Sequence, residues 1–346
     1  MCDSAFETQA RGLMEKVDAK VDVQVIKAGK VRRYAHLNLW QHFTVKGLMW
    51  NNFKDLFKIG QGFFQSVVAI KKFKPDVVFT KGGYVCLPVG AAAHLLRIPL
   101  VIHDSDSRPG LTNKLLSKWA DVIATGSPLE NYNYPAGKSH YIGVPISSKF
   151  QPKKPAEQKA AKKEFGFNPE RLLVVAVGGG LGAKSINNAM NKAAKSLIEQ
   201  GISTYVVAGK GHYNEASAAA PKTDKYKVVP FVYENMDKLL GAADIVVSRG
   251  SATFLQELAG LGKATIIVPA HQLSDQRKNA EVYRSAEAAL VVDNDGIESD
   301  NRLGEAILML ADDPVLRSEL GEKIHAFAKP QAASDLAQLI VEAVKR

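Results

Sequence analysis

Residues 172–185 read LLVVAVGGGLGAKS, and this stretch decides how the rest of the chain is interpreted. Its six leading apolar residues predict a buried strand, and the pattern from Ile186 to Gln200 predicts a helix. Glycines between a strand and a helix let backbone N–H groups approach an anion, and the positive end of the helix dipole points at the same place. We therefore expect a phosphate or diphosphate site near the middle of the chain, in the second of two domains.

Two nucleotide-binding motifs nearly match this turn. Gly178, Gly180 and Ala183 satisfy the loose dinucleotide fingerprint, but the next predicted strand, residues 203–207, has no acid at its end to hold a ribose. The turn also differs from a Walker A loop, because Ala183 replaces the glycine that such a loop needs before Lys and Ser. A turn that only lets helix and sheet pack closely is the structural alternative.

Strand-like apolar runs alternate with helical patterns along the whole chain. The runs in the first half are residues 23–26, 76–79, 99–102, 121–124 and 140–142. Those in the second half are residues 172–177, 203–207, 227–230, 244–247, 264–268 and 289–292. This alternation predicts an α/β protein whose parallel sheets are covered on both faces.

The expected domain boundaries follow from polar and proline-containing stretches. Residues 147–159, which include Pro152 and Pro155, are interpreted as an interdomain linker. Pro330 interrupts the last helical region, so residues 331–344 are expected to form a separate closing helix. We therefore expect an N-terminal domain over residues 1–148, a second domain over 149–328 and a C-terminal closing segment over 329–346.

Length and composition narrow the class of protein. A chain of 346 residues can form two full cores. The two cysteines, Cys2 and Cys86, provide neither a disulfide framework nor the spacing of a metal site, which favours a reducing cytoplasm. No apolar run reaches 18 residues, so no transmembrane helix is expected, and the N-terminus lacks the charge pattern of a signal peptide.

Positive charge is concentrated in the first half of the chain. Residues 1–150 carry 20 Lys and Arg against 11 Asp and Glu, whereas residues 151–346 carry 25 against 24. This asymmetry indicates an anionic partner surface. Aromatic residues interleaved with lysines favour a lipid headgroup interface over a pure core, and no nucleic-acid recognition motif is present. The residues concerned are Trp40, Phe43, Trp50, Phe53, Phe57, Phe63 and Phe64, with Lys46, Lys54, Lys58, Lys71 and Lys72.

Several loops that follow predicted strands carry polar or glycine-rich sequences. Ligands of open α/β sheets bind beyond the carboxyl ends of the strands. Such loops are Lys81-Gly82-Gly83-Tyr84, His103-Asp104-Ser105-Asp106, Arg249-Gly250-Ser251-Ala252 with Glu257 in the following helix, and residues 271–276. The alternatives without a functional role are a satisfied hydrogen bond for His103, helix capping by Asp104 and Asp106, a solvated helix position for Glu257, and a structural or surface position for Arg249.

The ordered set of segments resembles the MurG family, the peptidoglycan N-acetylglucosaminyltransferases that add GlcNAc to lipid I to form lipid II. The resemblance covers nearly the whole chain. It is carried by residues 29–34, 74–84, 102–106 and 109–114, by Gly143-Val144-Pro145, by the Gly178 turn, by residues 248–257, and by Asp275-Gln276 with Asn279-Ala280.

The resemblance implies a GT-B fold, in which two Rossmann-like domains flank a cleft. The first domain would bind the lipid-linked acceptor and contact the anionic membrane surface. The second would bind UDP-GlcNAc. The implied reaction is an inverting, metal-independent transfer at the cytoplasmic face of the cell membrane, with no cofactor and no nucleic-acid partner. The enzymatic alternative is a UDP-GlcNAc 2-epimerase, and the non-enzymatic one is a UDP-sugar-binding protein without catalytic activity.

The resemblance also implies roles for individual residues. The Gly178–Gly182 turn would face the diphosphate, Glu257 would hold the ribose hydroxyls, Gln276 would contact GlcNAc, and the backbone around Val232 would border the uracil. The residues expected to bind UDP-GlcNAc are Gly178, Gly179, Gly180, Gly182, Val232, Gly250, Ser251, Ala252, Glu257, Gln276 and Ser147. Those expected to bind the acceptor are Gly82, Gly83, Tyr84 and Asn113. No metal ligands are expected.

The chain departs from the family pattern at places that affect catalysis. Family members begin with a strand and a glycine-rich loop ending in Gly-His, and this chain begins after the corresponding region. Ser147 replaces a common Arg, and Asp104 replaces a usual Glu. The expected catalytic residues are therefore Asp104, His103 and Asp106, with Asp104 preferred as general base. We expect the chain to bind UDP-GlcNAc but to transfer sugar slowly or not at all.

Overall fold

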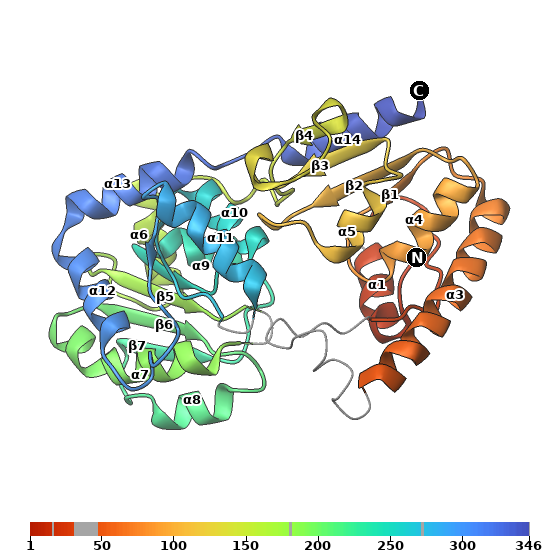
Figure 1. The fold of residues 1–346 in the computed structure, drawn as a ribbon. Helices are drawn as coiled ribbons and strands as arrows, with labels where there is room; N and C mark the ends of the chain where they lie inside the picture. The colour runs from red at the N-terminus through yellow and green to blue at the C-terminus, as the bar shows by residue number, and fades with distance from the viewer. Residues whose placement is uncertain (16, 31–47, 180–181, 271–272, 346) are drawn as a thin grey trace. The chain divides into compact units, whose positions relative to one another are not determined.

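The computed structural model describes residues 1–15, 17–30, 48–179, 182–270 and 273–345, and it divides the chain into two compact units (Figure 1). The first unit contains residues 1–142 and 334–346, and the second contains residues 143–333. The chain thus enters the second unit at Gly143, whereas the sequence placed this boundary after residue 148. The C-terminal segment, expected to form a separate closing helix over residues 329–346, belongs to the first unit from Ser334 onward.

Four parallel strands in the order β1-β2-β3-β4 form the sheet of the first unit. They are β1 (Val78–Thr80), β2 (Leu100–Asp104), β3 (Val122–Thr125) and β4 (Ser139–Tyr141). Alternate side chains of a strand point to opposite faces of its sheet. Leu100 and Ile102 pack with residues of α3 (Leu48–Phe73), α4 (Cys86–Leu95) and α5 (Leu111–Leu116). Val101 and Val122 pack instead against α14 (Ala332–Val344).

The prediction of a strand at residues 23–26 is wrong. Val25 forms one isolated parallel bridge with Cys2, and no ladder continues from it among the described residues. Val25 remains 38% exposed. An apolar alternation becomes a strand only where a neighbouring strand pairs along its length. The remaining short elements of this unit are η1 (Ser4–Phe6), α1 (Glu7–Met14), η2 (Leu129–Asn131) and η3 (Ala136–Lys138).

Six parallel strands in the order β10-β9-β8-β5-β6-β7 form the sheet of the second unit. They are β5 (Leu173–Val177), β6 (Ser203–Val207), β7 (Tyr226–Val229), β8 (Ile245–Ser248), β9 (Ala264–Ile267) and β10 (Leu290–Val291). The chain proceeds from β5 to one side of the sheet and later returns to β8 on the other side. The boundary between β5 and β8 is therefore the topological switch point, where ligands of such sheets bind.

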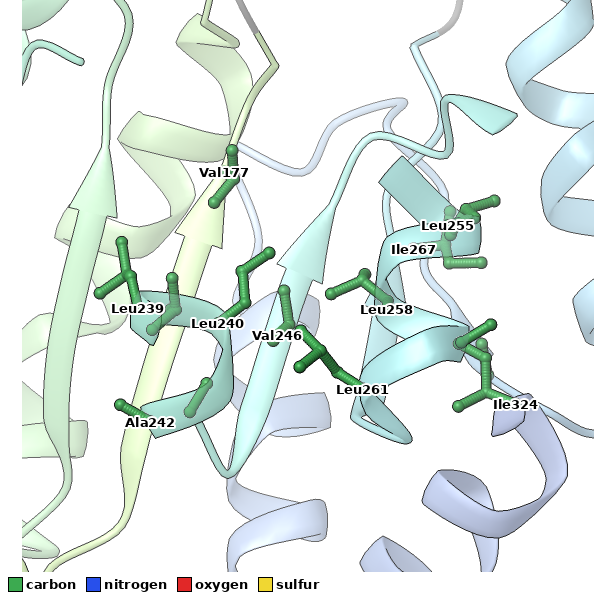
Figure 2. Close-up of a cluster of buried hydrophobic side chains, with 14 of the residues drawn as sticks. Val177, Leu239, Leu240, Ala242, Val246, Leu255, Leu258, Leu261, Ile267 and Ile324 are labelled. Atoms are coloured by element: carbon green, nitrogen blue, oxygen red, sulfur yellow. The ribbon is translucent and has the colours of Figure 1, made fainter. Parts of the chain in front are cut away.

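Helices cover both faces of this second sheet. The helices are α6 (Pro155–Glu164), α7 (Lys184–Glu199), α8 (Tyr213–Ala219), α9 (Met236–Ala242), α10 (Ala252–Leu261), α11 (Ser274–Ser285), α12 (Arg302–Asp312) and α13 (Pro314–His325). Figure 2 shows one of the two cores, in which Leu240 of α9 and Leu258 of α10 lie against Val246 of β8. On the other face, Val174 and Val247 pack with α7 and α12.

The expected linker over residues 147–159 is partly wrong, because α6 begins within it at Pro155. Proline is favoured at the first position of a helix, since its missing N–H would have no intrahelical partner there. Gln158 and Lys162 of α6 donate to the Asp244 carboxylate at 2.9 and 2.6 Å, which fixes this helix on the second unit. Among the described helices, none is both long and apolar enough to cross a membrane.

Candidate functional site

The switch point of the second unit brings together two loops that the sequence singled out. Val177, the last residue of β5, is the register partner of Ser248, the last residue of β8. Gly178 and Arg249 therefore leave neighbouring strands at the same edge of the sheet. This is the edge at which an open α/β sheet binds its ligand.

The turn after β5 has the geometry that its glycines predict. Gly179 and Gly182 have φ angles of 81° and 79°, and the Gly182 N–H donates to the Gly179 carbonyl at 2.9 Å. A Cβ at Gly178 would lie 2.3 Å from the Ala183 nitrogen, and one at Gly182 would lie 2.1 Å from the Ala208 carbonyl oxygen. Backbone conformation and close packing thus both require glycine here.

The turn leads into a helix whose N-terminal N–H groups are available to a ligand. None of the described side chains caps α7, and its N-cap residue is Ala183. Uncapped N–H groups and the helix dipole favour an anion at this end. Gly180, also predicted to bind the donor, lies outside the described residues.

The turn after β8 places Glu257 close to the same edge. Gly250 has a φ of 86°, and Ser251 and Ala252 start α10, on which Glu257 lies in the second turn. Burial raises the pKa of the Glu257 carboxyl to about 7. In the part of the chain that the structure describes, no group donates a hydrogen bond to this carboxyl. A partly buried carboxyl without donors suits a ligand that brings hydroxyl groups.

The structure also brings α11 to the Gly250 turn. The Asn279 amide donates to the Gly250 carbonyl at 3.1 Å, and a Cβ at Gly250 would lie 3.3 Å from the Gln276 carbonyl oxygen. The Gln276 side chain accepts a hydrogen bond from the Ala270 N–H at 3.1 Å. Gly250 and Gln276, predicted separately from the sequence, thus lie together. Residues 271–272 of the same loop lie outside the described residues.

Val232 and Ser147 lie in different surroundings. Val232 is half-buried against the core of the second unit, between Phe231 and Tyr233. Lys210, on the loop after β6, lies 5.0 Å from the centre of the Tyr233 ring. Ser147 is exposed, and its described hydrogen bonds stay within its own turn, where its hydroxyl accepts from the Lys149 N–H at 3.4 Å. No described hydrogen bond joins Ser147 to the strand-end loops.

In the first unit, two of the predicted acceptor loops lie next to each other. The Asn113 amide donates to the His103 carbonyl at 3.0 Å, and a Cβ at Gly82 would lie 3.0 Å from the same amide nitrogen. Gly82 and Gly83 both have positive φ angles, of 82° and 85°. Tyr84 follows them, and burial raises the pKa of its hydroxyl.

The carboxylate of Asp104 is buried and hydrogen-bonded. Its Oδ2 accepts the Tyr134 hydroxyl at 2.8 Å and the Gly110 N–H at 3.1 Å. Burial nevertheless raises the pKa of Asp104 to about 6. The Gly110 contact is the helix-terminus role considered from the sequence, since Gly110 is the N-cap residue of α5. The other two catalytic candidates differ in accessibility: Asp106 is partly exposed, whereas His103 is completely buried.

The sequence-based prediction did not include Tyr134, and it gave Arg249 only a structural or surface position without naming a contact. Tyr134 contacts Asp104 from a loop 30 residues further along the chain. Arg249 donates to the carbonyls of the Gly178 turn, 71 residues away from Gly178. The repeated tyrosines at 132 and 134 are a visible signal, but only the fold shows what they contact. For Arg249, the adjacent Gly250-Ser251 turn was the only local signal.

Comparisons with known proteins show the family and the fold of the chain. The model of the glycosyltransferase family 28 N-terminal domain matches residues 8–125, and that of the family 28 C-terminal domain matches residues 173–339. A UDP-N-acetylglucosamine–N-acetylmuramyl-(pentapeptide) pyrophosphoryl-undecaprenol N-acetylglucosamine transferase from an Exiguobacterium species is 34% identical over 294 residues, which are 83% of this chain and 80% of that protein. The protein of the same name from Geobacillus kaustophilus is 33% identical over 305 residues, or 86% and 80% of the two chains.

Solved structures show the same architecture. The crystal structure of Acinetobacter baumannii MurG has a TM-score of 0.68 and 26% identity, and the match covers 83% of this chain and 79% of that one. The UDP-GlcNAc 2-epimerase from Neisseria meningitidis has a TM-score of 0.64 at 14% identity, over 99% and 90% of the two chains, and it shows similarity of fold alone. The two parallel-sheet units have the GT-B fold, and the chain belongs to the MurG family within glycosyltransferase family 28.

Proposed function

We propose that this chain transfers GlcNAc from UDP-GlcNAc to lipid I, the undecaprenyl-diphosphate-linked N-acetylmuramyl pentapeptide, and thereby forms lipid II. The names of the related transferases support the reaction and its substrates. The observation that supports the donor most is the Gly178–Gly182 turn beside the Arg249–Glu257 loop at the switch point of the second sheet. An anion-binding turn next to a partly buried carboxyl suits a nucleoside diphosphate.

The described residues suggest how the donor is held. The N–H groups of the turn and the start of α7 face the diphosphate, the Glu257 carboxylate accepts the ribose hydroxyls, and the backbone at Val232 borders the uracil. Gln276 contacts the GlcNAc. As the anomeric C–O bond breaks, the same N–H groups and helix dipole stabilise the charge that develops on UDP, so we propose that the transfer needs no metal ion.

The acceptor hydroxyl attacks the anomeric carbon from the face opposite UDP, which inverts the configuration. A general base removes the hydroxyl proton as the new C–O bond forms and UDP departs with the electron pair of the old one. We propose Asp104 for this role, with Asp106 as the alternative. A pKa near 6 leaves the Asp104 carboxylate able to accept a proton at neutral pH, whereas Asp106 is the more exposed of the two.

The decisive experiment is an assay with purified lipid I and labelled UDP-GlcNAc. We expect labelled lipid II and an equal amount of UDP, and we expect chelation of divalent metals to leave the rate unchanged. Incubation without lipid I tests the enzymatic alternative, since an epimerase would form UDP-N-acetylmannosamine under those conditions. Tight binding of UDP-GlcNAc with neither product would instead support a binding protein.

Helix α3 supports a further proposal, peripheral contact with an anionic membrane. Exposed apolar side chains occur on α3 at a spacing that places them on one face, and exposed lysines flank them. Phe63 belongs to the core of the first unit, as a purely structural interpretation requires. The exposed residues are Phe53, Leu56, Phe57, Phe64 and Val68, with Lys54, Lys58, Lys71 and Lys72. Trp40, Phe43 and Lys46, part of the same prediction, lie outside the described residues, as does the side chain of Trp50.

A further inference from the structure

One guanidinium group holds both ends of the glycine turn. Nη1 of Arg249 donates to the Gly178 carbonyl at 3.1 Å and to the Gly182 carbonyl at 3.0 Å. Arg249 follows β8, whereas the turn follows β5, and these strands are neighbours in the sheet. A side chain of one loop therefore fixes the backbone of the other.

The positive charge of Arg249 has no counter-ion among the residues that the structure describes. Arg249 is half-buried, its Nε is buried, and no described atom accepts a hydrogen bond from that Nε. No carboxylate among the described residues pairs with the guanidinium. Carbonyl dipoles offset only part of the positive charge of a partly buried guanidinium. An anion bound on the adjacent turn would neutralise the remaining charge.

The orientation of the Gly178 and Gly182 carbonyls matters because, without Arg249, either carbonyl could point toward a bound phosphate. A peptide plane in a glycine turn rotates easily, and a carbonyl turned toward a phosphate repels it. While Arg249 holds the Gly178 and Gly182 carbonyls, neither can turn toward the anion. The hydrogen bond from the Gly182 N–H to the Gly179 carbonyl, at 2.9 Å, closes the turn further.

We propose that Arg249 is a positioning residue for the diphosphate: it keeps the Gly178 and Gly182 carbonyls away from the anion and places a positive charge behind the turn. The inference rests on the proposed UDP-sugar function and adds to it a residue that acts through the backbone. Because Arg249 acts on the phosphates alone, its effect on a ligand that lacks phosphates is small.

The test compares UDP with uridine by titration calorimetry, in the full chain and in Arg249→Met. We expect the variant to bind UDP at least about 10-fold more weakly, since the hydrogen bonds that would be misplaced join turn N–H groups to the charged diphosphate, and such bonds are worth that much or more. The affinity for uridine should change less than about 3-fold, because uridine offers no anion to the turn. The ratio of the two affinities, which a general loss of stability does not change, is the quantity measured.

The chain offers a matched control in Arg317. Its Nη1 donates to the carbonyls of Leu310 and Ala311 at 2.5 and 2.8 Å, so it also holds two carbonyls, but at the end of α12. Arg317→Met should lower the melting temperature and leave the UDP-to-uridine ratio unchanged. If Arg249→Met does not fold, Arg249→Gln, which is neutral but keeps a donor, is measured against the same criterion.

An unchanged ratio in the Arg249 variant would overturn this inference. A ratio that falls equally in the Arg317 variant would also overturn it, because the effect would then belong to lost stability. If the unmodified chain does not prefer UDP to uridine, the proposed donor function itself fails, and that result is distinguishable from the other two.

Discussion

At the scale of single residues, the raised pKa of the Glu257 carboxyl predicts that stability and UDP binding depend on pH. Its pKa is raised from 4.5 to about 7 by burial, so the folded protein disfavours the charged form. Its contribution to the free energy of unfolding is therefore fully present below pH 4.5 and is lost as the pH rises toward 7. Ribose hydroxyls that donate to the carboxylate would reverse this preference, so UDP binding should release a proton.

We expect UDP affinity to fall as the pH is lowered below 7, by up to about tenfold per unit. Glu257→Gln should remove this part of the pH dependence, and Glu257→Ala should weaken UDP binding by about 1–3 kcal/mol. Calorimetry in buffers with different ionisation enthalpies counts the released protons. The titration of UDP itself is common to all three proteins and cancels. Equal pH profiles for the unmodified chain and Glu257→Gln would exclude the ribose role.

The two aspartates of the β2 loop make a second prediction at this scale. Asp104→Asn keeps an acceptor for the Tyr134 hydroxyl but cannot take a proton. If Asp104 is the base, this variant should lower the transfer rate about 10²–10⁴-fold. The rate of the unmodified chain should rise with pH through about 6, as Asp104 loses its proton. The reverse result, loss of activity in Asp106→Asn and near-normal activity in Asp104→Asn, would assign the base to Asp106.

At the scale of single elements, the glycine turn offers a matched pair of substitutions. An added Cβ at Gly182 would meet the Ala208 carbonyl at 2.1 Å, whereas one at Gly179 would meet nothing within 4 Å, and both residues have positive φ angles. Gly179→Ala carries only the backbone strain, about 1–2 kcal/mol. Gly182→Ala must also displace the turn from the loop after β6, so it should weaken UDP binding clearly more. Equal UDP affinities in the two variants would show that the turn geometry does not set binding.

The proposed membrane contact of α3 is tested on exposed side chains. Phe57 and Phe64 are 65% and 70% exposed, so Phe57→Glu and Phe64→Glu should fold normally. Each should reduce sedimentation with anionic vesicles, and binding of the unmodified chain should weaken as salt is added. Val315→Glu, at a residue 66% exposed in the second unit, is the control and should bind normally. Salt-independent binding, or equal binding to neutral vesicles, would contradict the electrostatic part.

Sequence patterns predicted elements best where burial is complete. Strands β5, β6, β8 and β9 are buried along their whole length, and each coincides with an apolar run bounded by polar or glycine-containing residues. Residues 23–26 show a similar alternation but pair only through the single bridge from Val25 to Cys2 within the described part of the chain. The helix at Pro155 was interpreted as linker because prolines also mark loops. Local patterns therefore describe whether a segment is apolar, whereas pairing with distant segments decides whether that segment becomes a strand.

Local sequence patterns are limited in the same way for the proposed donor and acceptor sites. Glycines at 82, 178, 179 and 182 were visible in the sequence because few other residues suit their backbone conformation or close packing. The contacts of Arg249 with the Gly178 turn and of Tyr134 with Asp104 were not, since they join segments 71 and 30 residues apart. Such contacts depend on strand order, which periodicity does not reveal.

The two units, each with its own hydrophobic core, predict how the whole molecule unfolds. Separate cores favour separate transitions, and the proposed donor site lies entirely within the second unit. UDP at 100 times its dissociation constant should stabilise that unit by about 2.7 kcal/mol and leave the first unit unchanged. Scanning calorimetry should then show one transition raised by roughly 5–10 °C and another at its original temperature. A single transition that moves as a whole would show instead that the two units unfold together.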